Sequence, residues 1–226
     1  MTWTFTANEA IRRAKMKADM KNSNFVSNAD WYDFFNEAWT DLYDLLIETS
    51  EEYWIAEDTI TLTGVTDYAL PTDFYKSIAW DLAVNPSSNI YTTIKKYNNS
   101  ERNNTVGNVA NIPSGQIRLL YYPIPVKYDS GTGDDPIEGV AGYEKMIVTH
   151  MAAMALEAEE SSSTALRRAY DEQYRKIQEA ATNRSMGEPG TVSDSYVEGN
   201  SLYHPTLRYR LQGNTVRFLT TTYVGV

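Results

Sequence analysis

The chain has no cysteine, and this absence removes several classes of protein at once. Without thiols there is no disulfide, no zinc site built on cysteine and no thiol nucleophile. Histidine is also scarce, because His150 and His204 are the only two in 226 residues. They are far apart in the sequence, and neither stands in an HExxH or His-x-His pattern. We therefore expect no metal and no cofactor, and we expect both histidines to be structural or solvated.

Long apolar runs and positive charge are lacking as well. No apolar stretch approaches the roughly 20 residues that span a bilayer, and the N-terminus lacks the basic start and apolar core of a signal peptide. The formal net charge is −10, so the surface as a whole should not grip phosphate backbones. We expect no membrane partner and no specific binding of nucleic acid. The negative charge is explained by solubility alone, and it is also compatible with a negatively charged surface that DNA slides past without binding.

Catalytic motifs are missing too. The sequence contains no GxSxG motif, no phosphate-binding P-loop and no GxGxxG fingerprint. The acidic segment from Asp129 to Asp135 has the look of a calcium loop, but Gly131 and Gly133 stand where an EF-hand requires Asp or Asn. A solvated loop explains this segment better. The sequence thus predicts that the protein is not an enzyme.

Aromatic residues, in contrast, are plentiful, with 17 Tyr, 6 Phe and 5 Trp. Tyr and Trp are favoured where one end of the ring is buried and the other is wet, as in protein–protein interfaces. An aromatic-rich core accounts for the same composition, and composition alone leaves both interpretations open.

The pattern of apolar residues predicts four helices and an inserted sheet. Thr6 and Ser27 each begin a helical pattern, and Asp135 followed by Pro136 predicts another helix start. The expected helices cover residues 7–21, 28–54, 136–160 and 164–183, and the expected β insertion covers about 58–126. The predicted fold class is α+β and mainly helical: a helix bundle with an inserted small antiparallel β-sheet or barrel, plus an extended β-like C-terminal tail.

A linker pattern, Gly187-Glu-Pro-Gly190, divides the chain into a body (1–186) and a C-terminal arm (187–226). The arm has too few apolar residues in one place to fold alone and too many aromatic residues for a solvating tail. We predict that it docks on partner subunits, for example by adding strands to an exposed sheet edge. The alternative is that it packs back on its own body.

The predicted partner interface combines the arm with aromatic and basic faces of two helices. Helix 28–54 is apolar over more than half its circumference, so its second stripe either lies deep in its own fold or meets another chain. Helix 164–183 carries the densest basic face. The predicted interface residues are Tyr196, Tyr203, His204, Arg208, Tyr209, Arg210, Arg217, Phe218, Tyr223, Trp39, Tyr43, Arg167 and Arg168.

Five short segments follow one another in an order that resembles the head–tail adaptor (connector) proteins of tailed bacteriophages. The segments are Phe35-Asn-Glu-Ala-Trp39, Tyr68-Ala-Leu-Pro-Thr-Asp-Phe-Tyr75, Leu120-Tyr-Tyr-Pro-Ile-Pro125, Gly142-Tyr143 and Ala169-Tyr-Asp-Glu-Gln-Tyr174. The resemblance covers roughly residues 5–185, and none of its motifs is catalytic.

The resemblance implies a structural protein of the virion, located at the head–tail junction and assembled in the host cytoplasm. It implies a homo-oligomeric, dodecameric ring that binds the portal protein and tail, nozzle or tail-fibre proteins. Genomic DNA would pass through the lumen during ejection without specific binding. The arm 187–226 would grip the portal or neighbouring subunits. The alternatives are another phage tail structural protein, of the tube or nozzle type, and a soluble ligand-binding module.

Overall fold

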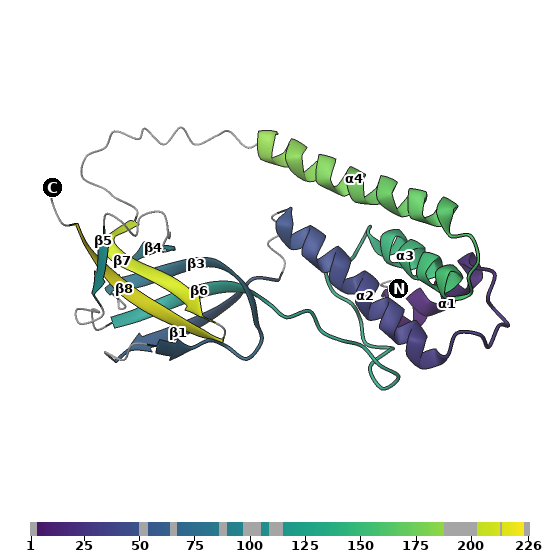
Figure 1. The fold of residues 1–226 in the computed structure, drawn as a ribbon, viewed down its shortest axis with the longest axis horizontal. Coiled ribbons are helices and arrows are strands. Elements are labelled where there is room, and N and C mark those ends of the chain that lie inside the picture. The colour runs from purple at the N-terminus through teal and green to yellow at the C-terminus, as the bar shows by residue number, and fades with distance from the viewer. Residues whose placement is uncertain are drawn as a thin grey trace. The chain divides into compact units, whose positions relative to one another are not determined.

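The computed structural model shows a chain that folds into two compact units, one helical and one β. It describes residues 4–49, 54–63, 67–85, 90–96, 105–108, 115–187, 203–212 and 214–223. The helical unit comprises Met1–Tyr53 and Pro125–Thr191, and the β unit comprises Trp54–Ile124 and Val192–Val226. Each unit is therefore built from two separate segments of the chain (Figure 1). The predicted α+β class is confirmed.

The helical unit contains four helices: α1 (Ala7–Lys17), α2 (Asn28–Glu48), α3 (Glu144–Ala158) and α4 (Thr164–Gly187). Both N-terminal helix starts follow the sequence signals. The Thr6 hydroxyl accepts a hydrogen bond from the Glu9 N–H at 3.2 Å, and Ser27 forms a complete capping box with Asp30. These bonds satisfy backbone N–H groups that have no partner inside the helix.

Helix α3 is the centre of this unit. Ten consecutive residues, 146–155, are buried, and α1, α2 and α4 all pack against α3. A helix that is buried on every side must be apolar around its whole circumference, as α3 largely is. The other three helices need only one apolar face, and they present their charged residues outward.

The predicted helix start at Asp135 is wrong. Helix α3 begins at Glu144, and residues 133–137 are instead held by Phe5, just before α1, and by Asn8 in its first turn. The Asn8 N–H donates to the Gly133 carbonyl at 2.9 Å, and the Ile137 N–H donates to the Phe5 carbonyl at 3.0 Å. These long-range backbone bonds keep the segment extended, so the local helix signal of Asp135-Pro136 is not used.

The other helix ends differ from expectation by a few residues. Helix α1 ends at Lys17 rather than 21, because Asp19 takes a positive φ of 58° that stops the helix. Helix α2 ends at Glu48 rather than 54, and α4 extends to Gly187 rather than 183. Such boundaries depend on packing and caps more than on periodicity.

The β unit is an eight-stranded sheet. Its strands are β1 (Ala56–Leu62), β2 (Asp67–Ala69), β3 (Phe74–Asn85), β4 (Ile90–Lys96), β5 (Thr105–Asn108), β6 (Gly115–Pro123), β7 (Tyr203–Gln212) and β8 (Thr215–Tyr223). The order is β1-β6-β3-β4-β7-β8-β2, and β5 also pairs with β8. All neighbours are antiparallel except β4 and β7, which run parallel. Strands β1 to β6 lie within the predicted insertion, except that β1 begins two residues earlier, at Ala56.

The core of the β unit draws on both of its chain segments. Trp80, Ile117 and Leu119 are fully buried in the cluster, and Tyr209 and Val216 join them from the C-terminal strands. A buried ion pair adds a polar link across strands, because Arg118 donates to Asp81 at 2.8 Å and Thr93 donates to the same carboxylate at 2.9 Å.

The predicted division into a body and a partner-seeking arm is not what the structure shows for residues 203–223. Strand β7 pairs with β4, and β8 pairs with β2 and β5 of the same chain. The physical reason is burial: Tyr209 is 7% exposed and Val216 is fully buried in the core of their own chain. The alternative stated from the sequence, packing back on the same chain, describes this segment. Residues 188–202 lie outside the described residues.

Candidate interaction surfaces

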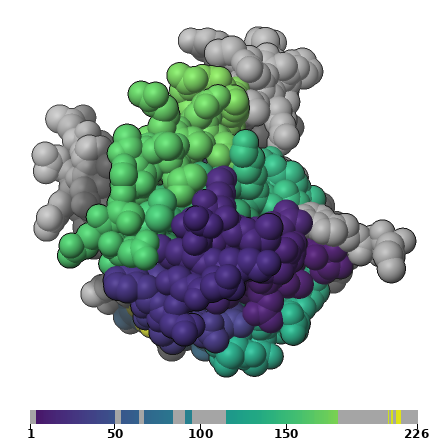
Figure 2. Space-filling view, turned by 90° about the vertical axis from the view of Figure 1, so that its right-hand side faces the viewer, coloured from purple at the N-terminus to yellow at the C-terminus, as the bar shows by residue number. Residues whose placement is uncertain are grey.

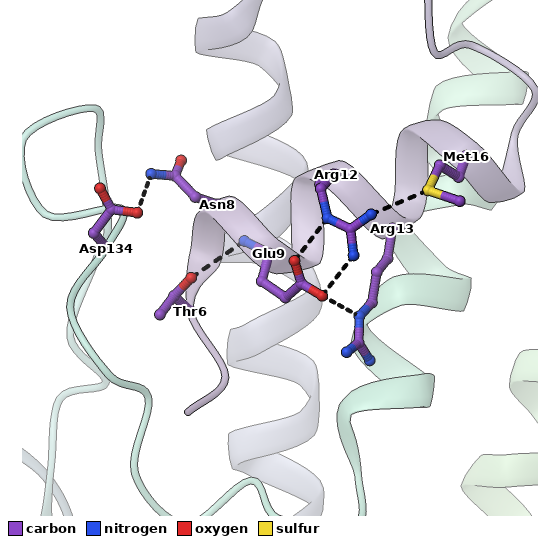
Figure 3. Close-up of polar contacts among 7 residues, drawn as sticks. All are labelled: Thr6, Asn8, Glu9, Arg12, Arg13, Met16 and Asp134. Atoms are coloured by element: carbon purple, nitrogen blue, oxygen red, sulfur yellow. Dashed lines mark hydrogen bonds and ion pairs between the residues drawn. The ribbon is translucent and has the colours of Figure 1, made fainter. Parts of the chain in front are cut away.

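The outer face of α1 is the first surface of interest, because it concentrates positive charge on an acidic chain. The helix carries Arg12, Arg13, Lys15 and Lys17 against a single acid, Glu9. Both arginines donate through Nε to the Glu9 carboxylate at 2.7 Å (Figure 3). These bonds from Arg12 and Arg13 lower the pKa of Glu9 to about 2. Glu9 thus stays ionised and orients the two guanidinium groups.

An open groove of about 350 Å³ runs beside this face. It is lined by Asn8, Ile11, Arg12, Lys15, Asn28, Tyr32 and Ser130. The unit also exposes two large apolar side chains in the same part of the sequence, Met16 at 55% and Phe25 at 60%. Figure 2 shows this side of the helical unit, with α1 and the segment after it in purple and blue-violet. Cations together with apolar side chains are typical of a contact surface for a protein.

The groove is preformed, because the segment before α3 is tied to α1. The Tyr32 hydroxyl donates to Asn8 Oδ1 at 2.6 Å, and Asn8 Nδ2 donates to Asp134 Oδ1 at 2.8 Å (Figure 3 shows the second bond). A Cβ atom on Gly133 would lie 2.5 Å from the Tyr32 hydroxyl oxygen, so a larger residue there would displace the Tyr32 side chain. Surfaces that are already ordered bind with a smaller entropic cost.

The acidic segment that looks like a calcium loop folds as a turn. The Asp129 carboxylate accepts hydrogen bonds from the N–H groups of Gly131 and Thr132, at 2.8 and 3.0 Å. These backbone bonds lower the pKa of Asp129. The carboxylate is therefore occupied by its own backbone, as in an Asx turn.

A polar cluster lies where α2, α3 and α4 meet. The His150 side chain is only 6% exposed, and its Nδ1 lies 3.4 Å from Asp41 Oδ2. The ring of Tyr170 from α4 stacks on His150 with 4.4 Å between centroids. Burial and the charge of Arg167 lower the pKa of His150, while burial and Asp44 raise that of Asp41. The histidine is thus a neutral packing residue, in the structural role that the sequence predicted.

Trp39 and Tyr43, which the sequence analysis assigned to a partner interface, are buried within the helical unit. They are 4% and 1% exposed, and their rings contact each other at 5.7 Å. Trp39 Nε1 also donates to the Val126 carbonyl at 3.1 Å. The second stripe of α2 therefore lies deep in its own fold, which is the other alternative stated from the sequence.

Arg167 and Arg168 lie in the first two turns of α4 and differ from each other. Arg167 donates to both oxygens of Glu157 at 2.7 and 2.6 Å, so it fastens the corner between α3 and α4. Arg168 is exposed and open to a partner. The basic face predicted for this helix is thus partly used within the chain.

The remaining predicted interface residues belong to the C-terminal strands. Tyr203, His204, Arg208, Tyr209 and Arg210 lie in β7, and Arg217, Phe218 and Tyr223 lie in β8. Tyr209 is the one whose side chain the structure describes, and it is buried against Trp80. Tyr196 lies outside the described residues. These residues belong to one hairpin of the β unit, whereas Arg167 and Arg168 belong to the helical unit.

The sequence analysis missed the groove at α1, because Asn8, Tyr32 and Ser130 come from three distant segments. Within the described ranges, no group of three or more His, Cys, Asp or Glu residues could hold a metal ion. No described helix is both long and apolar enough to cross a membrane.

Comparison with known proteins gives a match to a protein family. A search of curated proteins found no match. A family model described as "SU10 adaptor protein" matches residues 5–193, which include the whole helical unit from α1 to α4 and the first six strands of the sheet. The resemblance to phage head–tail adaptors stated from the sequence is confirmed by this match. Since the match covers most of the chain, the protein belongs to the SU10 adaptor family of phage adaptor proteins.

Proposed function

We propose that this phage adaptor forms a homo-oligomeric, dodecameric ring between the portal and the tail or nozzle of the virion. Genomic DNA passes through its lumen during ejection without specific binding, and the protein acts as a structural element rather than an enzyme. The membership of the adaptor family supports the location, and the net charge of −10 is compatible with a channel that does not retain DNA.

The observation that carries the ring is the one-sided packing of α4. Not one of residues 164–179 is fully buried, whereas ten residues of α3 are. The inner side of α4 contains apolar or aromatic residues that are only partly covered: Leu166, Tyr170, Tyr174 and Ile177. A helix of this length with a half-covered apolar side leaves area for a second copy to bury.

Electron microscopy of the negatively stained, purified chain tests the proposal, first alone and then mixed with its portal protein. We expect closed rings, and native mass spectrometry should give their copy number. Stacked tubes would instead support the second candidate, a tail-tube or nozzle-type protein. A chain that stays monomeric alone and with the portal at high concentration would overturn the proposal.

A further inference from the structure

One face of α2 carries all of its charge. The acidic residues are Asp30, Asp33, Glu37, Asp41, Asp44 and Glu48, and α2 contains no Lys or Arg. At about 100° per residue, their spacings of three or four place all six within an arc of roughly 80°. The row is about 27 Å long, from a rise of about 1.5 Å per residue. We call these six residues the acidic stripe.

Asp30 caps the start of α2, but the rest of the acidic stripe works against the stability of its own helix. Like charges three or four residues apart repel one another along a helix, and the stripe contains five such neighbouring pairs. The raised pKa of Asp41, caused by burial and by Asp44, is one sign of this repulsion. A cationic partner would relieve the repulsion, and this gives the stripe a reason to bind one.

Arg167 of the same chain lies near the stripe, and its charge opposes the rise in the pKa of Asp41. Arg167 is held by both oxygens of Glu157. His150 lies behind the stripe, more than nine-tenths buried, and its Nδ1 points at Asp41 without a hydrogen-bond partner among the described residues. Since burial keeps this imidazole neutral, it leaves the charge of the stripe in place. Asp33 and Glu37 form no ion pair within the described ranges.

A matching surface exists on the same chain. Helix α1 carries four basic residues and one acidic residue. Lys17 bonds Thr149 of α3 and Arg13 lies over the ring of Phe5, so Arg12, which pairs with Glu9, and Lys15 are the cations that line the groove. Met16 and Phe25 add exposed apolar area nearby. Both α1 and α2 cover α3 with their buried sides, so their charged sides are two different outward faces of one unit. Two different, complementary faces are what a ring of identical subunits requires at each interface.

We infer that the α1 face of one copy docks on the acidic stripe of the next copy, with Arg12 and Lys15 opposite Asp33 and Glu37. This inference rests on the proposed ring and names its interface. Phe34, which is partly buried beside the stripe, and Met16 supply apolar contact next to the ion pairs. Charge complementarity of this kind fixes the register of neighbouring subunits and selects the right partner.

Charge reversal on the full chain tests the inference. One variant carries Arg12→Glu and Lys15→Glu, and a second carries Asp33→Lys and Glu37→Lys. We expect neither variant to form rings alone, because each opposes like charges at every interface. A 1:1 mixture should restore rings in which the two variants alternate, because each interface then pairs opposite charges. Native mass spectrometry of isotope-labelled mixtures reads out the alternation directly.

A control variant, Glu138→Lys with Glu160→Lys, makes the same change in net charge as the Asp33→Lys, Glu37→Lys variant but at exposed positions off the stripe, and it should form rings normally. Circular dichroism confirms that each variant is folded. If a reversal variant does not fold, the neutral pair Asp33→Asn and Glu37→Gln replaces it and should weaken assembly at least tenfold. Rings that persist in the folded reversal variants, or a mixture that fails to restore them, would overturn this inference. A wild-type chain that forms no ring would overturn the proposed function instead.

Discussion

The ring of Tyr209 lies 4.8 Å from the ring of Trp80, and this contact joins the last strands of the chain to the centre of its β unit. Trp80 is 1% exposed and belongs to β3, whereas Tyr209 belongs to β7. The two residues are distant in sequence, so the contact forms only when the C-terminal hairpin has found its place beside β4. The contact between Trp80 and Tyr209 therefore helps to hold β7 in the core of the β unit, so that this part of the chain is not a loose tail.

Replacing Tyr209 with alanine should destabilise the β unit by about 3 kcal/mol, in the range for large aromatic truncations in a core. Tyr209→Phe keeps the ring and should cost no more than about 1 kcal/mol, the scale of one lost hydrogen bond. Urea denaturation followed by hydrogen exchange in β3 and β6 measures the effect, with exchange in α3 as the internal control. Equal stability of the two variants would show that the stacked ring does not matter.

Deleting residues 203–226 should damage the β unit and spare the helical unit. The deletion removes Tyr209 and Val216 from the core and leaves β4 as an open edge, which favours aggregation. We expect limited proteolysis to cut within 54–124 while the helical circular dichroism per helical residue is retained. A β unit as resistant to protease as that of the full chain would contradict the structural role of β7 and β8.

Stability should fall as the pH falls below about 6.5, and His150 should be the cause. Burial, and next to it the charge of Arg167, lowers the pKa of His150 below its ordinary value of 6.5. The unfolded chain then binds a proton that the folded chain resists, so the free energy of unfolding decreases as the pH falls through the unfolded pKa. Urea titrations between about pH 7.5 and about pH 5.5 measure this, above the range in which carboxylates titrate.

The two histidines give a matched control for this pH dependence. His150→Gln should flatten the profile, whereas His204→Gln should leave its slope unchanged. If the slope survives in His150→Gln, another group must carry it. If α4 is held by the Tyr170 stack as described, hydrogen exchange at the start of α4 should also rise at the lower pH.

Gly133→Ala should disturb the groove at α1. The added Cβ would lie 2.5 Å from the Tyr32 hydroxyl oxygen and 2.8 Å from Asn8 Oδ1, so the bonds among Tyr32, Asn8 and Asp134 must shift. Overpacking of this kind costs about 1–3 kcal/mol. Gly131→Ala, whose Cβ would meet only Asp129 Oδ1 at 3.3 Å, is the milder control. Thermal melts that do not separate the two variants would show that the segment can yield without loss.

Local sequence signals predicted the fold correctly where the stabilising hydrogen bond joins residues only a few positions apart. The caps at Thr6 and Ser27 need only Glu9 and Asp30, so both helix starts were found from the sequence. The alternation of apolar residues likewise located most of the sheet. Asp135 failed as a helix start because Phe5 and Asn8, far away in the sequence, bind that segment.

The interface residues were harder to predict, because an aromatic side chain suits a core as well as a contact surface. Trp39, Tyr43 and Tyr209 were all expected to meet a partner, and all three are buried in their own chain. Their true neighbours, Val126 and Trp80 among them, are set by tertiary packing that no periodicity encodes. The acidic stripe, in contrast, is visible in the spacing of the α2 carboxylates alone.

The order of strands has a consequence for biosynthesis. Since β7 and β8 follow α3 and α4 in the chain, the ribosome releases them only after the rest of the sheet and the whole α3–α4 hairpin. Until then β2 and β5 lack their partner β8, and β4 is paired only with β3; pairings this distant form slowly. The nascent chain can therefore complete its helices early and its sheet last, so a prematurely terminated product would carry an unfinished sheet with exposed strand edges that favour aggregation.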